Sequence, residues 1–174
     1  MAQTGPVRQA QGIDGANVVY RVSGDPSHRP LVLVHGWAQS SACWGDGLLA
    51  ELATRFRVIA VDLRGHGYSD APESGYADSA IWAGDVHAVL TAEDITADAV
   101  LLGWSYGGLV ICATTSPSTE PTRWRVWCWS VPSPASAAAR PGDASAQPCA
   151  RRSPGRWPRS RVPRSRRSAA SGSR

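Results

Sequence analysis

The chain has 174 residues, no lysine and a formal net charge of +4. Residues 1–112 hold six arginines and twelve acidic residues, whereas residues 113–174 hold twelve arginines and two acidic residues. This length allows one buried core, and no apolar run is long enough to cross a bilayer. The four cysteines show neither metal-ligand spacing nor a compact disulfide pattern, and no signal-peptide pattern is present. We therefore expect a cytoplasmic domain with no metal, no cofactor and no membrane contact.

The hydrophobic pattern predicts strands that alternate with helices after a polar lead-in over residues 1–17. The two short apolar runs at 31–34 and 57–62 are typical of strands buried on both faces of a parallel sheet. We predict a doubly wound, mostly parallel α/β sheet. The expected strands are 17–22, 31–34, 57–62 and 100–102, and the expected helices are 44–53, 77–91 and one that includes 109–111.

Three loops follow the carboxyl ends of these predicted strands, where ligands bind in sheets of this kind. The last of them, Gly103-Trp104-Ser105-Tyr106-Gly107, fits the G-x-S-x-G pattern of a nucleophile elbow. A serine on so sharp a turn between strand and helix adopts strained backbone angles, and glycines at the flanking positions avoid a collision. The pattern makes Ser105 a candidate nucleophile.

Each of these loops carries a motif, and the three motifs occur in a fixed order. They are Leu-Val-Leu-Val-His-Gly-Trp (31–37), Asp-Leu-Arg-Gly-His-Gly-Tyr-Ser-Asp (62–70) and Gly-Trp-Ser-Tyr-Gly-Gly (103–108). In these motifs residues 15–112 resemble the N-terminal half of the α/β-hydrolase fold family, close to its esterase-like, haloperoxidase-like and epoxide-hydrolase-like members. The resemblance implies hydrolysis of an ester or other acyl group on a small-molecule substrate.

The resemblance also assigns roles to the motif residues. Ser105 corresponds to the nucleophile, and the backbone N–H groups of Trp37 and Tyr106 correspond to the oxyanion hole that stabilises negative charge on the substrate oxygen. Structural roles are expected for the remaining motif positions. These are His35, Gly36, Asp62, Gly103 and Gly107.

Four polar residues have interpretations that involve no catalytic role. His66 is expected to make hydrogen bonds within its turn, and Asp62 to anchor that turn or to pair with Arg64. Asp85 and His87 lie two positions apart on a predicted helix and so do not face each other. We expect these two side chains to lie in solvent.

The sequence lacks the complete catalytic triad of a serine hydrolase. The family order is serine, acid and then histidine, but His28, His35, His66 and His87 all precede Ser105. An unassisted serine hydroxyl is a poor nucleophile at neutral pH. We therefore expect a nucleophile position without its general base, and an inactive chain.

Residues 113–174 differ in character from the rest, being rich in Pro, Ala, Ser, Gly and Arg beyond residue 132. A shift of one base converts the codons of 127–130 into four consecutive apolar residues, because their leading T moves to the middle position. Our hypothesis is a single-base insertion or deletion near codon 113. We expect 1–112 to be an incomplete hydrolase domain and 113–174 a non-homologous, disordered basic tail, which leaves the strand before Ser105 as an exposed sheet edge.

Two other functional classes stay open. The chain could be a pseudoenzyme that keeps the pocket as a binding module. The arginine-rich stretch 151–167 has the charge density of a nucleic-acid contact, although out-of-frame GC-rich DNA yields the same composition. We expect no specific nucleic-acid binding, and the sequence indicates neither the substrate nor the oligomeric state.

Overall fold

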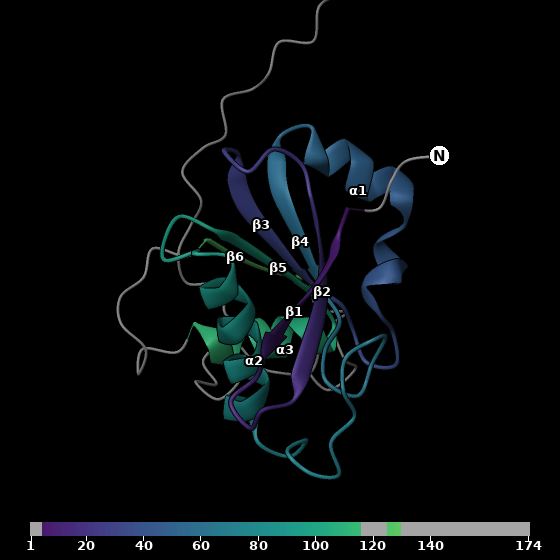
Figure 1. Cartoon of the computed structure of the whole chain (residues 1–174), viewed down its shortest axis with the longest axis vertical. Helices are drawn as coiled ribbons and strands as arrows, with labels where there is room; N and C mark the ends of the chain where they lie inside the picture. Colours follow the sequence, from purple (N-terminus) through teal and green to yellow (C-terminus); the bar gives the residue numbers. More distant parts are fainter. Residues whose placement is uncertain (1–4, 116–124, 130–174) are drawn as a thin grey trace, which may run out of the picture.

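A computed structural model describes residues 5–115 and 125–129 of the chain. Over this range it forms a six-stranded sheet with helices on both faces (Figure 1). The strands are β1 (Val7–Gln11), β2 (Asn17–Ser23), β3 (Arg29–Val34), β4 (Phe56–Val61), β5 (Val100–Trp104) and β6 (Arg125–Trp129). The helices are the 3₁₀ turn η1 (Ser41–Trp44) and the α-helices α1 (Asp46–Ala53), α2 (Ser79–Ala92) and α3 (Tyr106–Thr114).

The sheet has the strand order β1-β2-β4-β3-β5-β6. The pairs β4–β3, β3–β5 and β5–β6 are parallel, whereas β1–β2 and β2–β4 are antiparallel. The predicted mostly parallel α/β sheet is confirmed. The sequence pattern missed β1, because only Ala10 of this strand is buried and no apolar alternation marks it.

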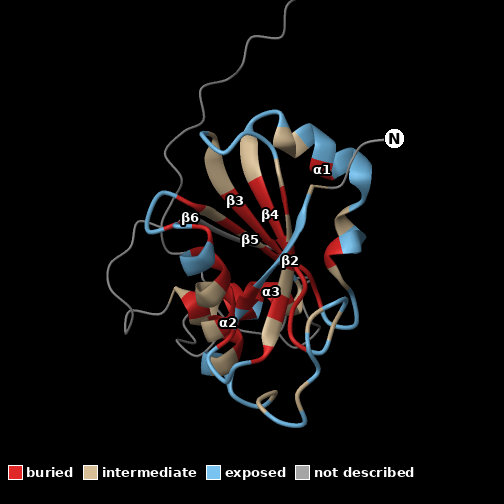
Figure 2. Cartoon of the chain, in the orientation of Figure 1, coloured by how far each residue is buried: buried red, intermediate tan, exposed pale blue. Residues whose placement is uncertain are grey.

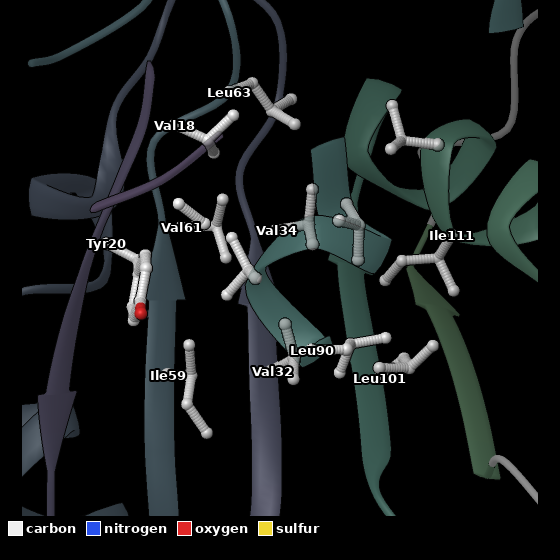
Figure 3. Packing of buried hydrophobic residues seen from close by; sticks show 14 of the residues in the cluster. Val18, Tyr20, Val32, Val34, Ile59, Val61, Leu63, Leu90, Leu101 and Ile111 are labelled. Carbon is white, nitrogen blue, oxygen red and sulfur yellow. The ribbon is translucent and has the colours of Figure 1, made fainter. Parts of the chain in front are cut away.

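Residues 31–34 of β3 and 58–61 of β4 are apolar and buried because helices cover both faces of these strands. Leu31 and Leu33 of β3 pack on the side of α1, together with Leu49 from that helix. Val32 and Val34 point to the opposite side and join the larger cluster. Figure 2 shows both strands largely buried, and Figure 3 shows Val32 and Val34 beside residues of α2, β5 and α3.

A buried ionic cluster joins three parts of the fold. The fully buried Arg64 donates hydrogen bonds of 2.7 Å to each carboxylate oxygen of Asp85 on α2. It also donates to both oxygens of Asp14, between β1 and β2, at 2.8 and 3.1 Å. These bonds from Arg64 lower the pKa of Asp14 to about 2. The cluster fastens the β1–β2 hairpin and α2 to the loop after β4.

The expectation that Asp85 lies in solvent is wrong, and of the two roles expected for Asp62 the pairing with Arg64 is not observed. Asp85 is not in solvent but fully buried, because Arg64 supplies the positive charge that a buried carboxylate needs. Asp62 does not pair with Arg64, whose donors are directed at Asp14 and Asp85. The half-buried His87 bonds through Nε2 to the Thr114 carbonyl.

The strand before Ser105 is not an exposed sheet edge, and that expectation is wrong. Strand β5 pairs with β3 on one side and with β6 on the other. Both β6 and the end of α3 belong to the range expected to form a disordered tail. Cys112 on α3 is disulfide-bonded, which the cysteine spacing did not indicate. The rest of the expected tail, 116–124 and 130–174 with its arginine-rich stretch, lies outside the described residues.

Removing Asp85 tests the energetic weight of the ionic cluster. Asp85→Ala leaves a buried guanidinium with Asp14 as its only carboxylate partner, and we expect a loss of about 3 kcal/mol in the free energy of unfolding in urea. The matched control is Asp98→Asn, at an exposed pair with Arg29, which should cost less than about 1 kcal/mol. Equal losses in the two variants would contradict a structural role for the cluster.

Candidate active site

The candidate site lies where the chain leaves the adjacent strands β3 and β5 in opposite directions. From β3 the chain crosses to β4, which flanks β3 on one side, whereas from β5 it proceeds to β6 on the far side. Parallel sheets open a crevice at such a reversal, beyond the carboxyl ends of the strands. The loop after Val34 and the residue Ser105 both begin at this point.

Ser105 occupies a single-residue turn between β5 and α3. Its backbone angles are φ 52° and ψ −118°, so it lies in a region that non-glycine residues rarely adopt. Such a conformation costs about 1–3 kcal/mol and persists only when the surroundings enforce it. The expected strain is confirmed, and the Gly108 N–H closes the turn by donating to the Ser105 carbonyl at 2.9 Å.

Glycines allow the backbones around this turn to come together. A Cβ at Gly103 would lie 2.5 Å from the carbonyl of Gly107, and one at Gly107 would lie 2.3 Å from the Val34 carbonyl oxygen. A Cβ at Gly36 would lie 3.3 Å from Cβ of Ser105. The loop after β3 and the turn at Ser105 are therefore in direct contact, as expected for Gly36, Gly103 and Gly107.

Two backbone N–H groups next to this turn are available to a ligand. Tyr106 is the first residue of α3, and N–H groups in the first turn of a helix have no partner within the helix. Within the described residues, neither the Tyr106 N–H nor the Trp37 N–H donates to an acceptor. The amino end of α3 also favours negative charge at this position.

Both ring nitrogens of His35 form hydrogen bonds to backbone groups of the loops after β3 and β4. Its Nε2 accepts from the Leu63 N–H at 3.0 Å, so the ring proton is on Nδ1, which donates to the Gly36 carbonyl at 2.7 Å. The ring is fully buried, and burial lowers the pKa of His35, which favours the neutral form. The structural role expected for His35 agrees with these contacts.

His66 makes an equivalent pair of bonds from the loop after β4. Its Nε2 accepts from the Ala38 N–H at 3.1 Å, and its Nδ1 donates to the Arg64 carbonyl at 2.8 Å. Both nitrogens of the His66 ring are thus occupied by backbone groups. In the described part of the chain, no histidine makes a hydrogen bond to Ser105.

Asp62 links the loop after β3 to the loop after β4. Its buried carboxylate accepts from the Ser41 N–H at 2.6 Å and from the Tyr68 N–H at 3.0 Å. Gly67 passes so close that a Cβ there would lie 2.3 Å from the Asp62 carboxylate. The expected anchoring role agrees with these contacts.

Sequence analysis missed an aromatic cluster beneath the site. The side chains of Trp37 and Tyr106 meet edge to face with centroids 5.4 Å apart, and Tyr106 packs on the buried Trp82 of α2 at 5.1 Å. Trp37 also meets the ring of His66 at 5.3 Å. The helical pattern placed Trp82 in the core, but its contacts with two distant loops depend on the tertiary fold.

The described part of the chain contains no group of three or more His, Cys, Asp or Glu side chains that could hold a metal ion. It also contains no helix long and apolar enough to cross a membrane.

Comparison with known proteins identifies the family of the chain. Residues 31–172 match the alpha/beta hydrolase family. The chain belongs to this family. A non-heme chloroperoxidase from Streptomyces lividans is 42% identical over 95 residues, which are 55% of this chain and 34% of that protein.

Solved structures of esterases share the same arrangement. The esterase RhEst1 from Rhodococcus sp. ECU1013 aligns with 63% identity and a TM-score of 0.63, covering 67% of this chain and 41% of that one. A putative aryl esterase from Burkholderia cenocepacia aligns with 30% identity and a TM-score of 0.62, covering 68% and 44%. The chain therefore spans well under half the length of these relatives.

The close approach at Gly103 can be tested by adding one methyl group. Gly103→Ala places a Cβ against backbone atoms that cannot rotate away, and we expect a loss of about 2–3 kcal/mol in the free energy of unfolding. Gly47→Ala is the matched control, because nothing lies within 4 Å of its Cβ position on α1, and alanine there should be neutral or stabilising. A stable Gly103→Ala variant would mean that the end of β5 and the start of α3 do not approach each other this closely.

Proposed function

We propose that residues 5–115 carry the nucleophile and oxyanion hole of a serine hydrolase that acts on an ester or other acyl group of a small molecule. The observation that carries this proposal is Ser105 at φ 52°, at the carboxyl end of β5, beside the N–H groups of Trp37 and Tyr106. The similarity to esterases and to a chloroperoxidase supports acyl chemistry at this site.

The chemistry follows from these groups. The Ser105 hydroxyl attacks the substrate carbonyl carbon, and the negative charge that develops on the carbonyl oxygen is stabilised by the N–H groups of Trp37 and Tyr106. The attack requires a base to accept the hydroxyl proton. His35 and His66 are the histidines nearest in the fold, and both of their ring nitrogens are bonded to backbone groups.

The same groups account for the inactive chain that we propose. No histidine follows Ser105 in the 174 residues, and the two that lie near it cannot take its proton without breaking the loops they hold. The site then retains the capacity to bind an acyl compound without turning it over. Trp37 and Trp104 are 59% and 42% exposed beside Ser105 and offer apolar contact surface for such a compound.

The rate of ester hydrolysis tests this proposal directly. For p-nitrophenyl acetate at neutral pH, we expect the hydrolysis rates of the wild type and of Ser105→Ala to agree within about threefold. The reason is that a serine without a general base does not accelerate the reaction. A wild-type rate about a hundredfold above that of Ser105→Ala would show that a base reaches the serine and would overturn the proposed inactivity.

We further propose that the base was lost by a change of reading frame near codon 113. Sequencing of the gene from independent isolates should show that a one-base shift opens a downstream frame with strand and helix patterns, a late Asp and a late His. A shifted frame without these features would contradict the frame change.

A further inference from the structure

The structure places His66 where it can control the position of an oxyanion donor. The Ala38 N–H, which follows Trp37 directly in the chain, donates to Nε2 of His66 at 3.1 Å. Ala38 has a φ of 57°, an unfavourable conformation for alanine, so the loop needs an external contact to hold this geometry. Within the described residues, the hydrogen bond from its N–H goes to His66.

The ring of His66 is itself held from two directions. Its Nδ1–H donates to the carbonyl of Arg64, whose guanidinium is fixed by the buried carboxylate of Asp85. Its ring also packs near the indoles of Trp37 and Trp82, with ring centroids 5.3 and 6.5 Å away. The imidazole thus connects the rigid loop after β4 to the loop that presents the Trp37 N–H.

We propose that His66 is a positioning residue that aims the Trp37 N–H toward the oxyanion by accepting the Ala38 N–H at its Nε2 atom. This inference rests on the proposed function, since it requires the Trp37 N–H to serve as an oxyanion donor. His66 touches no reacting atom and takes no proton from Ser105. Its role is to supply a neutral acceptor at a fixed point.

Two substitutions separate the acceptor from the aromatic ring. His66→Phe keeps a ring against Trp37 but has no acceptor for the Ala38 N–H. His66→Gln loses the ring but places its side-chain oxygen near the position of Nε2. His87→Phe is the control, because that imidazole bonds to the Thr114 carbonyl at the end of α3 and should not influence this loop.

The readouts are amide hydrogen exchange at Ala38 and binding of phenylphosphonate, a tetrahedral oxyanion probe, followed by NMR shifts of the Trp37 and Tyr106 amides. We expect His66→Phe to accelerate exchange at Ala38 and to weaken phenylphosphonate binding roughly fivefold to tenfold, the value of one hydrogen bond. His66→Gln should restore both properties, and His87→Phe should match the wild type. Thermal unfolding of each variant shows whether the fold is retained.

Several outcomes would overturn the inference. Equal Ala38 exchange and equal probe affinity in wild type and His66→Phe would show that the contact positions nothing. If a folded His66→Gln variant shows the same losses as His66→Phe, an acceptor at this position does not hold the loop and the proposed role of Nε2 is wrong. If phenylphosphonate shifts neither the Trp37 nor the Tyr106 amide of the wild type, the oxyanion hole and the inference fail together. If Ala38 exchange is still slow in that case, the contact with His66 is intact and it is the proposed function that is wrong.

Discussion

The close approach of the backbone at the end of β3 to the backbone of the Ser105 turn sets the geometry of the candidate site. The loop after β3 and the turn at Ser105 touch at Gly107, where a Cβ would collide with the Val34 carbonyl oxygen, and the end of β5 meets the start of α3 equally closely at Gly103. These contacts hold Ser105 in its strained conformation and bring the loop that carries Trp37 beside the amino end of α3. Strain at one residue is tolerated because the strands behind it are buried on both faces and resist movement.

The histidines near the site hold neighbouring loops together. His35 and His66 each accept one backbone N–H and donate to one backbone carbonyl, and both bond to loops that flank Ser105. An imidazole bonded on both nitrogens cannot also remove a proton from a serine. The buried Arg64 contributes from further away, since it fixes the loop from which His66 projects.

Much of this arrangement could be predicted from sequence, and the failures have physical causes. The wholly apolar runs of β3 and β4 gave the buried parallel strands, and the flanking glycines gave the strained turn at Ser105. The burial of Asp85 could not be predicted, because its partner Arg64 is 21 residues away and the two meet only through the tertiary fold. The same holds for Trp82, whose helical spacing indicates burial but not its contact with Tyr106. The pairing of β6 with β5 was missed because a single strand among Pro, Ser and Arg carries too little periodicity.

The central claim is that Ser105 occupies a formed nucleophile position without a base within reach. Intact-protein mass spectrometry after incubation with an alkyl fluorophosphonate at neutral pH tests it most directly. The account predicts that the mass of the wild type stays unchanged, as does that of Ser105→Ala. A single adduct per chain that maps to Ser105 and is absent from Ser105→Ala would contradict it, because phosphonylation requires an activated serine.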